Sequence, residues 1–244
     1  MRLKRLLLAS SALALFAGAG TAQADGLYIS VFGGANWAED SSASFFTRDE
    51  TDDATGYNWS TDADTGFVIG GVVGTHLDKW VQGLRVELEA SYRRNDVGGV
   101  WNASDFDTGP TVDFTTGGTI DANLSTFAVM ANVWYEHDMG WKVRPYVGGG
   151  VGWGRTKFDG ALLTTTTFDT TFDRENDGFA WQLGVGFNYE AAPGVDVGLG
   201  YRYFNGPDIN EPFGIDPFFG GKQFFGKVEN DNHSVMVNLT IDVN

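Results

Sequence analysis

Hydrophobic residues alternate with polar or small residues along several stretches of this chain. The clearest stretch runs from Leu84 to Arg93 (LRVELEASYR), where every second side chain is apolar. This period of two is typical of a β-strand with one apolar and one polar face. The same pattern recurs over residues 181–189, 195–203 and 235–243. These four stretches predict four strands, each of them apolar on one side.

Four further stretches alternate less regularly but are compatible with strands, namely residues 26–37, 65–77, 125–137 and 143–155. The total of eight is even, and the lengths are close to the ~9–11 residues that a tilted strand needs to cross a bilayer.

The connections between these stretches alternate strictly between short and long. The short ones are 78–83, 138–142 and 191–194, and the long ones are 38–64, 95–123, 156–177 and 205–231. Outer-membrane barrels have short periplasmic turns and long extracellular loops. A soluble β-sandwich, the alternative, has no reason to show that asymmetry. The sequence therefore predicts an all-β fold, an eight-stranded antiparallel up-and-down transmembrane β-barrel.

The N-terminal 24 residues have the three regions of a secretory signal peptide. Three basic residues lie within the first five positions, an apolar run follows, and Ala22-Gln23-Ala24 matches an A-x-A cleavage site. The apolar run is shorter than the ~20 residues of a membrane-spanning helix. We expect residues 1–24 to be cleaved during export and residues 25–244 to form the barrel domain.

The composition removes several classes of function. The 244 residues include 34 Gly and no Cys, so disulfide scaffolds, thiolate zinc sites and cysteine nucleophiles are excluded. Asp and Glu total 32 against 16 Lys and Arg, a net charge of −16. A nucleic-acid partner is not expected, because binding it requires a basic surface.

The side of each strand that faces lipid follows from the charged residues. If Leu84, Val86 and Leu88 face lipid, the charged residues between them face the lumen; the opposite register would place arginines in hydrocarbon, at about 2–4 kcal/mol each. Applied to all strands, this parity predicts a lumen network of Arg85, Glu87, Glu89, Arg93, Glu136, Arg144, Asp196, Arg202 and Asp242.

An eight-stranded barrel is only just wide enough for its own side chains. We therefore expect these charges to form a packed ion-pair network, because an unpaired buried charge is costly. A narrow gated conductance through rearranged pairs is the alternative.

The four long connections carry most of the excess negative charge. Without the three bases of the signal peptide the net charge is −19, and these connections hold 23 acids against five bases. Such charge is usually solvated surface, but it could also hold divalent cations that bridge to lipopolysaccharide phosphates.

The last connection also contains five phenylalanines, Phe213, Phe218, Phe219, Phe224 and Phe225. An exposed cluster of this kind can mark contact with a partner, a receptor or lipid headgroups, although folding onto the barrel rim would explain it equally well.

No catalytic, cofactor or metal site is expected from the motifs. The segment Asp173–Gly178 resembles the start of a calcium loop, but Gly184 stands where the bidentate Glu should be. His233-Ser234 suggests a lipid-A hydrolase, yet neighbours on a strand point to opposite faces and cannot pair directly. His233 and Asp231 do share a face near the rim, so this chemistry stays an alternative.

These stretches together resemble the small outer-membrane barrels of the opacity and surface-antigen type, which share the architecture of the OmpA barrel. The matching segments are GLYISVFGGA at 26–35, PYVGGGVG at 145–152, FAWQLGVGFNY at 179–189 and LGYRYF at 199–204. The chain departs from the pattern at its C-terminus, Val243-Asn244, where such proteins commonly have an aromatic residue.

The resemblance implies a location in the bacterial outer membrane and insertion by the barrel-assembly machinery. The expected partners are outer-membrane lipid and lipopolysaccharide, and the expected role is that of a non-enzymatic surface and envelope protein. A lipid-A modifying enzyme, a small gated pore and an adhesin or ligand receptor are the alternatives.

Overall fold

The computed structural model describes residues 26–39, 41–48, 54–105, 116–164, 170–209, 212–215, 223–225 and 228–243. Side chains are described in the same ranges except at 41–48, 54–59, 61, 101–105, 116–117, 162–164, 170, 172, 212–215 and 223–225. The expected signal peptide lies outside these residues and stays a prediction. Within the described part, no helix is long and apolar enough to span a bilayer.

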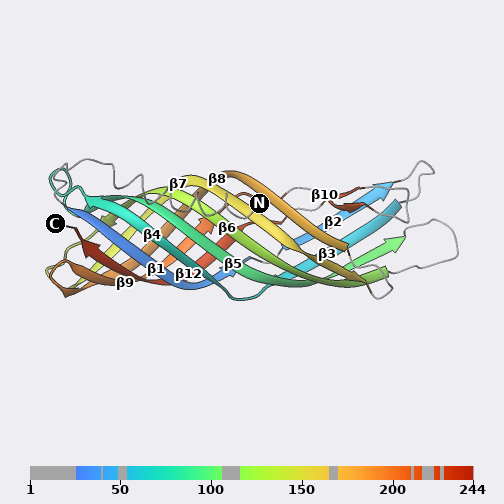
Figure 1. Ribbon diagram of the computed structural model, residues 1–244, viewed down its shortest axis with the longest axis horizontal. Coiled ribbons are helices and arrows are strands. Elements are labelled where there is room, and N and C mark those ends of the chain that lie inside the picture. The colour runs from blue at the N-terminus through green and yellow to red at the C-terminus, as the bar shows by residue number, and fades with distance from the viewer. Residues whose placement is uncertain are drawn as a thin grey trace, which may run out of the picture.

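Eight antiparallel strands form a closed barrel (Figure 1). They are β1 (Leu27–Ala38), β4 (Gly66–His76), β5 (Leu84–Asp105), β6 (Thr116–Glu136), β7 (Val143–Thr164), β8 (Thr170–Ala192), β9 (Val195–Asn205) and β12 (Asp231–Asp242). Each of these eight strands pairs with the next one in this order. The first and the last also pair, β1 with β12, from Tyr28–Asp242 to Ala38–Asn232. Because the sheet closes on itself, the eight-stranded up-and-down barrel expected from the sequence is confirmed.

The apolar residues of the predicted strands lie on the outside of this barrel. On β6, Val129 and Val133 are exposed on the outer wall, whereas Met130 and Asn132 are buried in the lumen. The outward apolar positions of β6 run from Phe127 to Tyr135. These nine residues, at about 3.3 Å each and tilted by about 40°, match the ~25 Å apolar band of an outer-membrane barrel.

Each of the three short turns contains a glycine with a positive φ, Gly83 (80°), Gly140 (74°) and Gly194 (72°). Other residues rarely adopt this conformation. The Asp78 and Asp138 side chains accept hydrogen bonds from the Gly83 and Gly140 amides, both at 2.8 Å. The short turns are therefore fixed by residues within the turns themselves.

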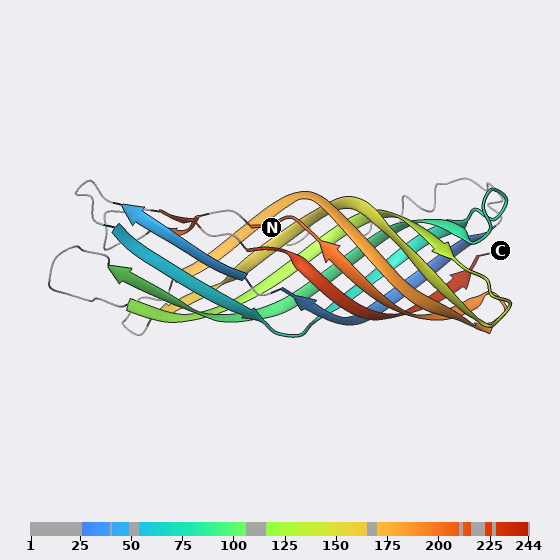
Figure 2. The ribbon, with the colours of Figure 1, turned by 180° about the vertical axis from the view of Figure 1, so that it is seen from behind.

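The long connections differ from the loops expected from the sequence, because much of them is β-structure. Strands β5 to β8 have 21–23 residues, about twice the length needed to cross the bilayer. They continue past the apolar band on the side opposite the C-terminus (Figures 1 and 2).

Beyond the membrane, the apolar side of these long strands changes from the outside to the inside. On β6, Ile120, Ala122 and Leu124 face inward and are buried, whereas Asp121 points outward and is exposed. Outside the bilayer the outer wall meets water, so the apolar side chains pack against one another inside. The side chains of β6 keep alternating inward and outward, but the apolar residues shift from the inward to the outward positions between Leu124 and Phe127. Because of this shift the hydrophobic pattern in the sequence did not reveal the strand extensions.

Four shorter strands complete the extracellular end. β2 (Ser41–Arg48) and β3 (Ala54–Ala63) form a hairpin, and β3 pairs with the outer part of β5. β10 (Pro212–Ile215) and β11 (Gln223–Phe225) form a second hairpin, whose strands contact β8 and β2 respectively. In Figure 1 β2, β3 and β10 gather at one end of the molecule, far from the C-terminus.

Glycines on the lumen side of β7 make room for the large side chains of β6, and this close packing can be tested. A Cβ atom added at Gly150 would meet Asn132 Oδ1 and the Ala131 carbonyl, whereas nothing lies within 4 Å of one added at Gly98. We expect Gly150→Ala to lower the free energy of unfolding by about 1–3 kcal/mol and Gly98→Ala to change it by less than about 0.5 kcal/mol. Urea titration of the refolded protein, followed by heat-modifiable gel migration, measures both. Equal midpoints for the two variants would show that the lumen is not tightly packed at Gly150.

Candidate functional site

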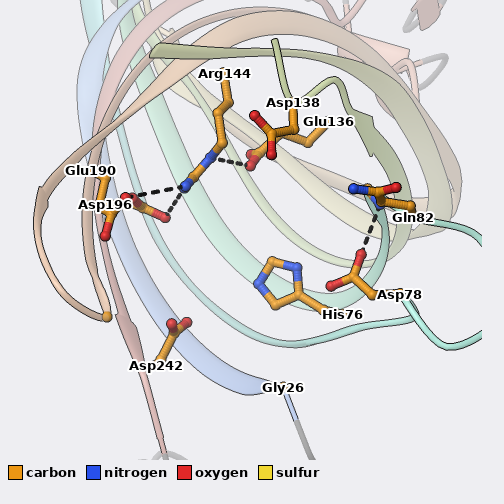
Figure 3. Close-up of a pocket in the computed structure, with 12 residues that line it drawn as sticks. Gly26, His76, Asp78, Gln82, Glu136, Asp138, Arg144, Glu190, Asp196 and Asp242 are labelled. Atoms are coloured by element: carbon orange, nitrogen blue, oxygen red, sulfur yellow. Dashed lines mark hydrogen bonds and ion pairs between the residues drawn. The ribbon is translucent and has the colours of Figure 1, made fainter. Parts of the chain in front are cut away.

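The lumen opens at its periplasmic end into a cavity of about 650 Å³. We call this cavity the vestibule. Figure 3 shows Arg144 reaching across it between carboxylates on two sides. Its Nε lies 2.6 Å from Glu136 Oε1 and its Nη2 lies 2.5 Å from Asp196 Oδ2. Glu136 also accepts from Arg85 Nη1 at 3.3 Å and from Asn188 Nδ2 at 2.5 Å. Four strands, β5, β6, β7 and β9, thus supply one charged cluster at the inner mouth.

The next level of the lumen is centred on Glu87. Its two carboxylate oxygens accept hydrogen bonds from Tyr28 OH at 2.7 Å and Trp134 Nε1 at 2.8 Å. Arg85 lies 3.7 Å from the same carboxylate and over the Tyr146 ring. Large aromatic side chains therefore fill the space between charges, and each one that meets Glu87 also donates to it.

Glu89, the third level, is completely buried. One of its oxygens, Oε2, accepts from Arg202 Nη1 at 2.5 Å, Asn132 Nδ2 at 2.8 Å and Gln182 Nε2 at 3.1 Å. The Arg202 guanidinium also lies between the rings of Phe32 and Trp134. A buried carboxylate that accepts three hydrogen bonds, one from a cation, is stabilised in its charged form.

Arg93, at the fourth level, is the exception among the lumen arginines. The Cζ atom of its guanidinium lies over the Phe204 ring, 3.3 Å from the centroid, and its Nη2 donates to Ser91 Oγ at 3.4 Å. In the described part of the chain no carboxylate lies within 4 Å of it, and its Nε and Nη1 have no hydrogen-bond partner. The four lumen carboxylates are thus shared by three arginines, and the fourth arginine is held by an aromatic ring.

Above Arg93 a layer of amide and hydroxyl side chains crosses the barrel. Asn36 Nδ2 donates to Asn95 Oδ1 at 2.5 Å and Asn232 Oδ1 at 2.8 Å. Asn230 Nδ2 donates to Thr156 Oγ1 at 2.7 Å and Thr126 Oγ1 at 3.0 Å. These buried polar residues were not anticipated from the sequence, although Asn36, Asn95 and Asn232 lie on the predicted lumen parity.

The outer mouth is filled by two segments of the connection between β9 and β12, residues 206–209 and 228–230, which fold inward. Ile209 and Val228 pair as an isolated bridge and are both buried. They pack in an apolar cluster with Ala38, Val97, Ile120, Ala122, Leu124 and Phe158. We call the segments 206–209 and 228–230 the plug. No local pattern in the sequence revealed it, because its burial depends on strands far away along the chain.

The structure brings most of the predicted lumen residues together but not all of them. Arg85, Glu87, Glu89, Glu136, Arg144, Asp196 and Arg202 take part in ion pairs, and Arg93 is buried without one. Asp242 does not belong to the buried set: it is exposed at the rim of the vestibule, because β12 ends there and water reaches its side chain. The expected phenylalanine contact lies outside the described part of the chain, which includes neither Phe218 and Phe219 nor the side chains of Phe213, Phe224 and Phe225.

His233 and Asp231 lie on the outer wall near the extracellular rim. His233 Nδ1 is 2.5 Å from Tyr201 OH, and its Nε2 is 3.2 Å from Glu39 Oε1. Asp231 Oδ1 accepts from Tyr203 OH at 2.7 Å and from Asn205. Ser234 points inward instead, where its hydroxyl donates to Asn36. Among the described residues, no group of three or more His, Asp or Glu could hold a metal ion.

An apolar outer wall around a lumen of paired charges defines a transmembrane β-barrel protein of the bacterial outer membrane. The family described as outer membrane protein beta-barrel domain matches residues 6–240, and the chain belongs to this family.

Several solved structures are similar to this chain, and one of them, with a TM-score above 0.5, agrees with the fold. OprG from Pseudomonas aeruginosa is 18% identical, with a TM-score of 0.53, over 89% of this chain and 97% of that one. Neisserial surface protein A is 16% identical with a TM-score of 0.45, over 89% and 97% of the two chains. The outer membrane protease OmpT from Escherichia coli is 10% identical with a TM-score of 0.48, over 90% and 97%. No curated protein matches the sequence.

The Glu89 contacts allow a test of how the lumen charges depend on one another. We expect Glu89→Ala to destabilise the protein by about 3–5 kcal/mol, because it leaves Arg202 buried without a carboxylate. The double variant Glu89→Leu with Arg202→Met should recover most of that loss, since it removes both charges and keeps apolar volume. Asp242→Asn, at the exposed rim, is the control and should change the free energy of unfolding by less than about 0.5 kcal/mol. A double variant no more stable than Glu89→Ala would contradict the pairing.

Proposed function

We propose that this protein is a non-conducting surface barrel that contributes to the integrity of the outer membrane and to contacts at the cell surface. The observation that carries this proposal is the filled lumen, which is occupied by side chains at the levels of Glu87, Glu89 and Arg93 above the periplasmic cavity and is covered by the plug at its outer end. A barrel closed in this way serves as an anchor for the structure it displays outside the membrane.

The ion pairs support a lumen that is closed to ions. Arg85, Arg144 and Arg202 each contact a carboxylate from another strand. The Arg202–Glu89 pair joins β9 to β5 on the opposite wall of the lumen. Conduction would require these pairs to separate in a space of low dielectric constant, where the attraction between charges is strong.

The plug supports it independently. Pro207 lies against the glycine surface of β7 and β8, where a Cβ at Gly154 would be only 3.0 Å from its ring. Asn230 then fixes the second plug segment to Thr126 and Thr156. An apolar seal of this kind excludes water and ions from the outer mouth.

The extracellular end supports a role at the surface. Its outer wall is polar and mostly acidic, with exposed carboxylates on β5, β6 and β8 such as Asp96, Asp121 and Glu175. This surface would face lipopolysaccharide and the medium, and its carboxylates could hold divalent cations. Insertion by the barrel-assembly machinery after signal-peptide-dependent export is part of the same proposal.

The absence of conductance is the direct test of the closed lumen. Purified full-length protein, reconstituted in planar bilayers at 1 M KCl, should give no discrete current steps, because both the ion pairs and the plug block the lumen. Ile209→Asp, which places a charge in the apolar cluster, should loosen the plug and provides the comparison. Regular steps from the unmodified protein would overturn the proposal in favour of a pore.

The envelope role is tested in cells. Deletion of the gene should increase sensitivity to detergent and chelator, and the unmodified gene should restore resistance. Lipid A from deletion and overexpression strains should have the same mass, since we propose no enzymatic activity. A mass difference that follows the gene would instead point to the Glu39, His233 and Tyr201 contacts on the outer wall, and His233→Ala would then identify whether they act.

A further inference from the structure

Three cations on the outer wall form a group that the packed lumen does not explain. Arg94 on β5 and Arg155 and Lys157 on β7 point away from the barrel, with side-chain exposures of 45%, 51% and 41%. Among the described side chains of the extracellular extension, they are the only Lys or Arg on the outward face of the strands. We call them the basic cluster.

The register places the basic cluster directly beyond the outer aromatic residues of the membrane band. Phe127 pairs with Arg155, and Phe67 pairs with Arg94. Trp153, also exposed, lies two residues before Arg155 on the same face of β7. Aromatic side chains of outer-membrane barrels mark the bilayer interface. The basic cluster therefore lies at the depth of the lipid headgroups of the outer leaflet.

The three cations are close enough to contact one headgroup. Ser125 on β6 pairs with Arg94 on one side and Lys157 on the other, so these two lie two strand spacings apart, about 10 Å. Arg155 and Lys157 are two residues apart along β7, about 7 Å. Ser125 is short and leaves the cations on either side uncovered.

Neighbouring side chains orient the two arginines without neutralising them fully. Asn123 Oδ1 accepts from Arg94 Nη2 at 2.7 Å, whereas the nearest carboxylate oxygen, on Asp96, is 3.8 Å from Arg94 Nε. The Asp177 carboxylate accepts from the Trp153 indole at 3.2 Å and lies 3.9 Å from Arg155. Exposed pairs at such distances contribute little and exchange readily for a stronger anion.

Lys157 is bound more closely by carboxylates, from Asp173 at 3.1 Å and Asp159 at 3.6 Å. The hydrogen bond to Asp173 and the charges of both carboxylates raise the pKa of the Lys157 ammonium above its usual value. The Lys157 ammonium is therefore charged at neutral pH. Asp159 lies two residues farther from the membrane on β7 and pairs with Asp173 on β8, whereas Glu175 and Asp177 pair with Lys157 and Arg155. The three bases therefore outnumber the two carboxylates at their own level, and the next outward positions, Asp96, Asp159 and Asp173, are acidic.

We propose that the basic cluster binds the phosphorylated sugar headgroup of lipopolysaccharide in the outer leaflet. Phosphate is the anion that arginine binds best, through paired N–H donors. A phospholipid offers one phosphate, whereas a lipid-A headgroup carries its phosphates on one rigid disaccharide that can span separated cations. The site rests on the extracellular placement of the extended strands and not on the closure of the lumen.

The binding experiment uses the full-length folded protein in zwitterionic detergent, with purified rough-type lipopolysaccharide as the probe, and is read by native mass spectrometry. The variant Arg94→Gln/Arg155→Gln/Lys157→Gln keeps polar, unbranched side chains and removes the three charges. We expect it to raise the half-saturating concentration at least about tenfold, because each base near an anionic lipid surface contributes appreciably. The control Lys79→Gln/Lys142→Gln removes two charges from the periplasmic turns and should change that concentration less than about twofold.

Three further arms identify the ligand chemistry. Enzymatically dephosphorylated lipopolysaccharide should bind the unmodified protein as weakly as intact lipopolysaccharide binds the triple variant. Binding should persist in EDTA, because the contact is direct and needs no bridging cation. Phosphatidylglycerol at equal concentration should compete poorly.

The proposal fails if the triple variant binds like the unmodified protein while heat-modifiable migration shows both to be folded. It also fails if EDTA abolishes binding, which would assign it to the acidic residues, or if phosphatidylglycerol competes equally. Failure here leaves the conductance result untouched, and a conducting barrel would leave this surface unaffected, so the two proposals are separable.

Discussion

The structure depends on one constraint, that no backbone polar group can remain unpaired in hydrocarbon. A closed sheet satisfies it, and here closure is made by β1 pairing with β12 at the two ends of the chain. Closure with an apolar outside forces the other face of every strand inward, including its arginines and carboxylates. The ion pairs of the lumen are a consequence of this geometry, because eight strands enclose too little space for those charges to be surrounded by bulk water.

The same constraint ends at the bilayer surface, and the strands record where it ends. Val129 and Val133 of β6 face lipid, while Ile120 and Leu124 of the same strand face inward. Past this point the extension is organised like a soluble β-protein, with its own apolar cluster that also receives Ile209 and Val228 of the plug. One set of long strands thus serves as a membrane anchor at one end and as a surface structure at the other.

The two halves meet at the level of Arg93 and the layer of amide and hydroxyl groups above it. Below this level charges pair with charges; above it neutral side chains such as Asn36 and Asn230 cross-link the strands and the plug. Arg93 lies on Phe204 between the two regimes. On the outside, the corresponding boundary carries the aromatic residues and the basic cluster, so the interface is marked on both faces of the wall.

The sequence alone determined the number and order of the barrel strands and the face of each that meets lipid. Alternation with period two is a local property of the sequence. Once Arg85 is placed in the lumen, because an arginine in lipid is costly, the facing direction of every other residue of that strand follows. The exposed position of Asp242 was not determined in that way, since parity does not say where a strand leaves the barrel.

Only the tertiary structure decided which arginine meets which carboxylate, that β5 to β8 continue beyond the bilayer, and that the plug folds inward. Arg202 meets Glu89 across 113 positions of sequence, and Asn230 meets Thr126 across 104. Such contacts form because the closed sheet brings strands that are far apart in the sequence to the same level of the lumen. No local pattern along the chain specifies which of these residues will meet.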